Sequence, residues 1–237
     1  MMAWLKQIAF IALVMVLPGI IAFYLCFPDG YPAFSGVAFT RPTLIIDAGH
    51  GGEDGGAISL TGTLESHLNL AIAQRVDLVL GLFGAPSCMV RQQDVSLHDS
   101  QASTLREKKN SDLRNRVELV SQQENAVLLS IHQNSFPSGK YSGAQVFFAP
   151  TDGSQSLADA MQEALRAAAD PSNTRQMAPI SKTVYLLNHV ACPAVLVECG
   201  FLTNPAEEQR LREPGYQTKL AAAMSGCWLR YSGNFQS

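Results

Sequence analysis

Two histidines and two glutamates are the residues of this sequence whose types best suit hydrolytic chemistry. His50 and His132 each follow an apolar run, and Glu198 lies within a third, AVLVECG. Glu65 opens a helical pattern just after the segment TGT. Two imidazoles and a carboxylate suit zinc, which keeps a fourth position for water in catalytic sites. The remaining carboxylate would take a proton from that water and give it to a leaving amine.

The elements that position these residues are predicted from the apolar runs themselves. Segments 43–48, 126–132 and 194–199 are expected to be strands, and the last two are apolar on both alternating faces. That pattern is typical of a sheet covered by helices on both sides. Ligands of open α/β sheets bind outside the carboxyl ends of the strands, so the three strand ends are expected to converge there. Spacing alone leaves open which glutamate binds metal and which handles protons.

The stretch GHGGEDGG places four glycines within the six residues that follow His50. Glycine has no Cβ atom, so these residues would let the backbone wrap tightly around a metal ion. Glu53 and Asp54, in the same loop, are expected to be solvated charges. Glu65 alone would be explained as an acid that complements a helix dipole. The combination of the four positions nevertheless favours a metal site. A charged Glu198 in a buried strand would cost free energy unless it had such a role.

The other three histidines have no partner at a suggestive spacing, and we expect none of them to bind metal: His67, His98 and His189.

The remainder of the chain alternates short β-rich runs with longer helical patterns, which indicates an α/β fold with a largely parallel or mixed sheet. Leucines and valines at three- to four-residue spacing along the first helix would face that sheet. The further strands are expected at 87–92, 143–149 and 182–187, and the helices at 64–82, 110–124, 154–169 and 214–231.

Composition sets limits on the class of protein. The chain has 237 residues, 47% of them apolar, and a formal charge of −3, so no basic field points to nucleic acid. Its five cysteines form no CxxC pair. Cys192 and Cys199, on one predicted strand, would stand roughly 23 Å apart and cannot bridge each other. We expect the cysteines to be buried small hydrophobic residues.

The N-terminus carries the clearest boundary. No charge occurs from position 7 to 28, a length that suits one crossing of a membrane. We therefore expect a membrane anchor at 1–28, a linker at 29–42 and a catalytic domain at 43–237, with a cleaved signal peptide as the alternative to the anchor. Either reading predicts that the domain is exported.

Four motifs together carry a family resemblance. The stretches IIDAGHGGEDGG, LLSIHQNS and AVLVECGFLTNPAEEQRL, with a glutamate fifteen residues after the first histidine, resemble the zinc-dependent N-acetylmuramoyl-L-alanine amidases of bacterial cell walls. The likeness runs in order from about position 43 to the C-terminus. It is nearest to the membrane-anchored sporulation and germination branch, which prepares muramic δ-lactam in spore cortex.

The resemblance implies a division of labour among the four residues. His50, Glu65 and His132 would bind Zn²⁺, and Glu198 would be the catalytic carboxylate. It also implies a twisted, mainly parallel six-strand sheet flanked by helices on both faces. Peptidoglycan would be the substrate, met on the outer face of the cytoplasmic membrane of a spore-forming bacterium.

Substrate contacts and rival chemistries complete the expectations. Asn134 and the 133–142 loop would line a groove, and Arg175 would meet a stem-peptide carboxylate unless it is a solvated loop charge. Rival hypotheses are a cysteine peptidase that uses Cys199, a glycosidase that pairs Glu65 with Glu198, and a non-catalytic wall-binding domain. The sequence shows no wall-binding repeat and no long insertion before Glu198, so a regulatory partner protein is one way to restrain the enzyme.

Overall fold

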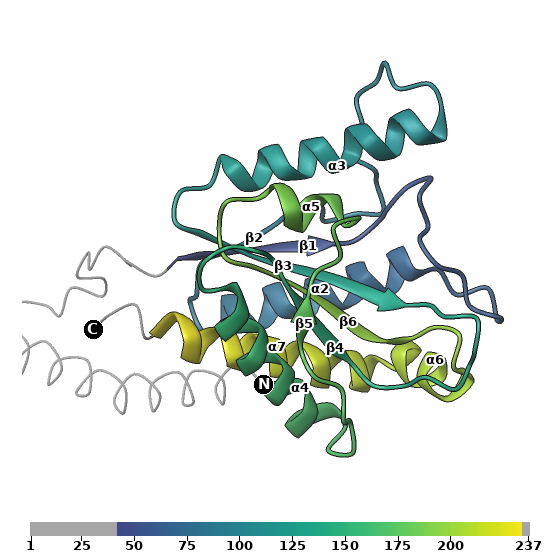
Figure 1. Cartoon of the computed structure of the whole chain (residues 1–237), viewed down its shortest axis with the longest axis vertical. Helices are drawn as coiled ribbons and strands as arrows, with labels where there is room; N and C mark the ends of the chain where they lie inside the picture. The colour runs from purple at the N-terminus through teal and green to yellow at the C-terminus, as the bar shows by residue number, and fades with distance from the viewer. Residues whose placement is uncertain (1–41, 234–237) are drawn as a thin grey trace, which may run out of the picture. The chain divides into compact units, whose positions relative to one another are not determined.

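The computed structural model describes residues 42–233, which form a six-stranded sheet with helices on both faces (Figure 1). The elements in chain order are β1 (Thr43–Ala48), α2 (Glu65–Leu82), β2 (Ser87–Met89), α3 (Leu105–Ser121), β3 (Ala126–Asn134), β4 (Gln145–Phe148), α4 (Ser154–Ala169), β5 (Ala178–Pro179), α5 (Tyr185–His189), β6 (Ala194–Phe201), α6 (Pro205–Arg212) and α7 (Pro214–Gly233).

The strands lie in the order β2-β1-β3-β6-β4-β5. All neighbouring pairs are parallel except β4 with β6. The expected six-stranded, mainly parallel sheet is therefore confirmed. The strands β1, β3 and β6 are adjacent, so their carboxyl ends meet at one edge of the sheet. In this register His132 lies directly opposite Glu198.

Alternation along the strands divides the core into two layers. One layer contains alternate residues of β1 (Leu44, Ile46 and Ala48), which pack against the buried faces of α2, α4 and α7. Ile45 faces the other side, where α3 and α5 cover the sheet. Each face of the central strands is buried, which explains why their sequences are apolar at successive positions rather than at alternate ones.

One predicted strand is wrong. Segment 182–187 does not pair in the sheet; it contains a turn followed by the start of α5. The strand that pairs with β4 in its place is the two-residue β5. The adjacent Leu186 and Leu187 are both buried against the α3 face. A short apolar run has the same composition in a buried helix as in a strand, so the pattern could not separate the two.

Two helices differ from expectation, one in its start and one in its existence. The helix expected at 110–124 begins earlier, at Leu105, because Thr104 and Glu107 form a capping box. The helix α6 was not predicted, although Asn204 caps its N-terminus and Pro205 occupies its first turn. Both residues are ordinary start signals for a helix.

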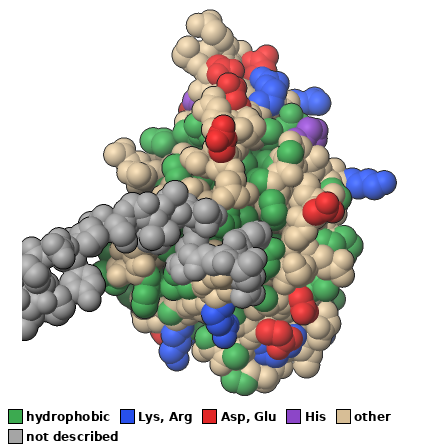
Figure 2. All heavy atoms as spheres, turned by 90° about the vertical axis from the view of Figure 1, so that its left-hand side faces the viewer, with side chains coloured by type: hydrophobic (Ala, Val, Ile, Leu, Met, Phe, Trp, Pro, Cys, Tyr) green, Lys and Arg blue, Asp and Glu red, His purple; other side chains and the backbone are tan. Residues whose placement is uncertain are grey.

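The expected anchor at 1–28 lies outside the described residues, as does nearly all of the linker at 29–42. Within 42–233, no helix combines the length and apolar character that a membrane crossing requires. Figure 2 views the molecule from the end where β1 begins; acidic and basic side chains are scattered over that face among apolar and neutral ones.

Candidate metal centre

The structure brings His50, Glu65 and His132 together at the carboxyl edge of the sheet. One potential ligand atom from each of the three lies within 4.8 Å of the other two. Oε1 of Glu65 is 2.9 Å from Nδ1 of His132 and 3.4 Å from Nε2 of His50. The residues come from the end of β1, the first turn of α2 and the end of β3, so the sheet topology itself assembles the cluster.

The loop after β1 leaves no room for side chains at two glycines. A Cβ atom on Gly49 would stand 2.2 Å from the His132 ring, and one on Gly56 would stand 2.6 Å from Oε2 of Glu65. His50 itself adopts a φ of +62°, a left-handed conformation that is uncommon for residues other than glycine. Gly49 and Gly56 are therefore required by close packing around the cluster. Of the four glycines that follow His50, the expectation holds for Gly56, whereas Cβ atoms on Gly51 and Gly52 would meet Val95 and Ser96 of another loop.

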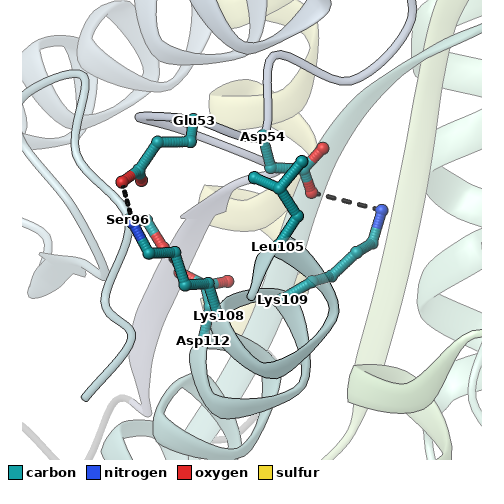
Figure 3. Close-up of a pocket in the computed structure, with 7 residues that line it drawn as sticks. All are labelled: Glu53, Asp54, Ser96, Leu105, Lys108, Lys109 and Asp112. Carbon is teal, nitrogen blue, oxygen red and sulfur yellow. Dashed lines mark hydrogen bonds and ion pairs between the residues drawn. The ribbon is translucent and has the colours of Figure 1, made fainter. Parts of the chain in front are cut away.

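Asp54 fixes the orientation of His50. Its Oδ2 lies 3.0 Å from Nδ1 of that histidine, which leaves Nε2 to face the cluster. Lys109 of α3 pairs with the same carboxylate oxygen at 3.2 Å, and Lys108 pairs with Glu53 at 2.5 Å (Figure 3). The expectation of a solvated loop charge is thus wrong for Asp54, whereas Glu53 is exposed to solvent as expected and forms a surface ion pair with Lys108. A carboxylate behind a histidine is the usual outer partner of a metal ligand.

Glu65 is buried and fully supplied with hydrogen-bond donors. Its Oε1 accepts from the backbone N–H of Gln133 and from the side-chain amide of Asn69, and its Oε2 accepts from the N–H of Ala57. Burial acts to raise the pKa of Glu65, but the hydrogen bonds from His132 and His50 outweigh it and hold the pKa below its usual range. Glu65 is therefore an anion in a preformed pocket.

Glu198 has the opposite environment. It lies on β6 opposite His132, and its Oε2 is buried without a hydrogen-bond partner among the described residues. Burial raises the pKa of Glu198 to about 7. The two glutamates therefore differ physically: Glu65 is held charged, whereas Glu198 keeps an unsatisfied oxygen and a pKa suited to proton transfer near neutral pH.

Cys199 is a poor nucleophile in this structure. The residue is completely buried, and it belongs to the core layer shared with α2 and α7. Burial raises the pKa of its thiol well above the usual range. Since a thiolate is the reactive form, this environment argues against the cysteine-peptidase hypothesis.

None of the three remaining histidines belongs to the cluster found within residues 42–233. His67 pairs with Asp94 at 3.1 Å and is largely exposed. His189 stacks on Tyr185, with ring centroids 3.8 Å apart.

Arg175 lies in the loop before β5 and contacts β4, the strand next to the one that carries Glu198. Its Nε donates to the carbonyl of Ser142 at 2.7 Å, and Nη1 donates to Oε1 of Gln145 at 3.0 Å. The guanidinium lies 4.5 Å from the centre of the Phe201 ring. Gln145 is the antiparallel partner of Glu198. Arg175 is thus held in place within the loop before β5, and whether it meets a substrate stays a prediction.

Asn134 ends β3, two residues beyond His132, and is half-buried. Its carbonyl accepts from the N–H of Leu202, which fixes the backbone. The loop that follows is fastened to the start of α6, because Phe136 N–H donates to Thr203 and the Asn204 amide donates to the carbonyl of Tyr141.

These donors fit a divalent cation of zinc type. Two imidazoles and one carboxylate converge, and the imidazole of His50 has the carboxylate of Asp54 behind it. The unpartnered carboxylate oxygen belongs to Glu198, which lies opposite His132 on the neighbouring strand. Fold and site together define the class: a hydrolase-type centre at the carboxyl edge of an α/β sheet.

The chain belongs to the N-acetylmuramoyl-L-alanine amidase family (Amidase_3), whose model matches residues 44–226. It is 37% identical over 189 residues to the germination-specific N-acetylmuramoyl-L-alanine amidase of Bacillus subtilis, covering 79% of this chain and 78% of that protein. It is 31% identical to the amidase LytC of the same organism, with 77% of this chain covered but 34% of LytC.

Solved structures agree with this membership. The CwlD amidase of Clostridioides difficile, determined in complex with the GerS lipoprotein, is 36% identical with a TM-score of 0.77 and covers 82% of this chain and 100% of its own. The amidase AmiC2 of Nostoc punctiforme is 26% identical with a TM-score of 0.69, covering 83% of this chain and 98% of its own.

Proposed function

We propose that this protein is a zinc-dependent N-acetylmuramoyl-L-alanine amidase that acts on the peptidoglycan of the spore cortex, as a step toward muramic δ-lactam. The observation that carries the proposal is the convergence of His50, Glu65 and His132, with Glu198 beside them, in a chain of this family. The reaction hydrolyses the amide between the lactyl group of muramic acid and the L-alanine of the stem peptide.

The proposed chemistry gives each residue one task. When bound, zinc supplies an acidified water and polarises the scissile carbonyl. His50 and His132 supply neutral imidazoles, and Glu65 supplies the one anionic ligand. Glu198 accepts the proton of the water and passes it to the departing alanine amine, for which its buried, unpartnered Oε2 is suited.

Arg175 is proposed to bind a carboxylate of the stem peptide. Its Nε and Nη1 are committed to Ser142 and Gln145, while no described residue accepts a hydrogen bond from Nη2. The stacking on Phe201 removes most of the rotamer freedom that an arginine loses on binding. A guanidinium held against Gln145, the strand partner of Glu198, would orient an anionic peptide.

Asn134 is proposed to line the same groove. Its backbone is fixed by Leu202, and its side-chain amide makes no hydrogen bond to the described residues, so it is available to a substrate. We further propose an anchor at 1–28 that keeps the domain on the outer face of the membrane. The lipoprotein bound to the Clostridioides difficile relative supports a partner protein that regulates the enzyme.

The decisive experiment is mass spectrometry of peptidoglycan digested by the purified protein, with a zinc assay on the same sample. We expect new alanine amino ends, near-stoichiometric zinc, and loss of activity in chelator but not in iodoacetamide. New reducing sugar ends would instead support the glycosidase hypothesis, and an unchanged digest would support a non-catalytic wall-binding domain.

A further inference from the structure

Arg91 is a buried cation that binds only backbone carbonyls. The residue follows β2 and is 3% exposed. Its Nε donates to Ala48 at 2.8 Å, Nη1 to Gln93 at 2.9 Å, and Nη2 to both Gly49 and Ser66, at 3.1 and 2.9 Å. Four carbonyls from three separate segments thus share one guanidinium.

Such a placement is costly, because a buried charge is normally paired with an opposite one. The other buried arginine of the region, Arg116, makes salt bridges to Asp47 and Asp112. Arg91 makes no salt bridge to any described residue. Packing alone would be served by an apolar side chain of the same length, so the guanidinium points to a task that requires a planar fork with several donors.

The carbonyls that Arg91 joins belong to the segments that present two of the cluster residues. Ala48 and Gly49 immediately precede His50, and Ser66 immediately follows Glu65. The single nitrogen Nη2 bridges the two segments.

His50 adopts a left-handed backbone, which is maintained only where surrounding contacts over-determine it. Arg116 completes the hold by donating from Nη2 to the carbonyl of His50 at 2.8 Å.

We propose that Arg91 is a positioning residue that sets the separation of His50 and Glu65 and so pre-organises the metal site. The inference rests on the proposed metal binding and adds a residue that does not touch the metal. This role explains why a buried charge occupies this position. The guanidinium bridges both segments and so holds the side chains of His50 and Glu65 at a fixed distance from each other before any cation binds.

The test is zinc affinity of the full chain, measured by competition with a chromophoric chelator. Arg91→Lys keeps the charge but loses the fork, and we expect its zinc affinity to fall roughly 10- to 100-fold, the usual effect of removing an outer partner of a ligand. Excess zinc should restore kcat with KM unchanged. Arg91→Gln, which keeps one donor nitrogen with two N–H groups and no charge, is measured in parallel in case the lysine variant does not fold.

Arg210→Lys is the matched control. Arg210 donates to the carbonyl of Ala169 and stacks on Tyr216, so it also ties segments together, but none of them presents a cluster residue. We expect it to lower the melting temperature without changing zinc affinity.

Equal zinc affinity in wild type and both Arg91 variants would overturn the inference, as would a loss matched by Arg210→Lys. A wild-type protein that binds no zinc would instead overturn the proposed function itself.

Discussion

The imidazole of His132 lies against Gly49 so closely that a Cβ atom there would stand 2.2 Å from its Nε2 and Cε1 atoms. Gly49 ends no helix and has an ordinary φ, so the requirement for glycine at this position comes from the neighbouring ring and not from the backbone. Because real Cβ atoms do not approach other atoms so closely, a larger residue must displace His132.

Gly49→Ala should therefore weaken zinc binding although it alters no cluster residue. We expect destabilisation of about 1–3 kcal/mol, typical of overpacking, and a fall in zinc content measured by atomic emission. Gly81→Ala is the control, since a Cβ at that helical position meets nothing within 4 Å and alanine favours the helix. Full zinc occupancy in Gly49→Ala would show that the ring is free to move away.

Asp54→Asn tests the orientation of His50. The amide removes the charge that holds Nδ1, so zinc affinity should fall by roughly tenfold or more. The control is Glu53→Gln, the neighbouring acid, which pairs only with Lys108 and should leave affinity unchanged. Isothermal titration of the two variants separates a specific effect from a general loss of loop charge; identical affinities would remove Asp54 from the site.

Much of this site was predictable from the sequence, because local apolar runs indicate where each strand ends along the chain. His50, His132 and Glu198 could be placed at one edge from that rule alone. The bounds of β1 were predicted correctly for the same reason. The short helix α5 was mistaken for a strand because composition does not separate the two over six residues.

The residues that hold the cluster in place could not be predicted in this way. Arg91, Arg116 and Asp54 act through contacts that only the folded chain creates, such as a guanidinium 42 residues distant in sequence from the carbonyl it binds. Periodicity reports which face a residue takes, but not which carbonyl it reaches. The start of α6, by contrast, is predictable from the sequence, because Asn204 is a favourable N-cap residue and Pro205 is favourable in the first turn of a helix.

The buried carboxyl of Glu198 predicts a pH-dependent stability of the metal-free protein. Burial raises its pKa from 4.5 to about 7. Its contribution to the free energy of unfolding is therefore complete below pH 4.5 and is lost as the pH rises through 7. Glu198→Gln mimics the protonated form at every pH.

We expect the stability of the wild type to fall relative to Glu198→Gln by about 3 kcal/mol between pH 4 and pH 8, the value of a shift of roughly two and a half pKa units. Urea denaturation of both proteins in chelator, at a series of pH values, gives the difference directly. Parallel stability curves across that range would mean that Glu198 is solvated in the metal-free protein.

The two glutamates can finally be separated by replacing each with its amide. Glu65→Gln weakens the metal site, because a neutral amide oxygen is a poorer zinc ligand than a carboxylate. Zinc content should fall, and excess zinc should restore part of the activity. In Glu198→Gln the ligands remain, so zinc should stay bound, while the rate should fall by roughly 10²–10⁴, the usual contribution of a positioned acid–base group.

Zinc content is measured beside the release of new alanine amino ends for both variants, and His67→Gln serves as the control because that histidine pairs with Asp94 outside the cluster. Added zinc should rescue nothing in Glu198→Gln, since the missing function there is proton acceptance. If instead Glu198→Gln loses its metal while Glu65→Gln keeps both metal and rate, Glu198 is a metal ligand and Glu65 takes no part in the chemistry. In that case the buried, donor-rich pocket around Glu65 serves only to hold the start of α2 against β3, and the metal is held by His50, His132 and Glu198.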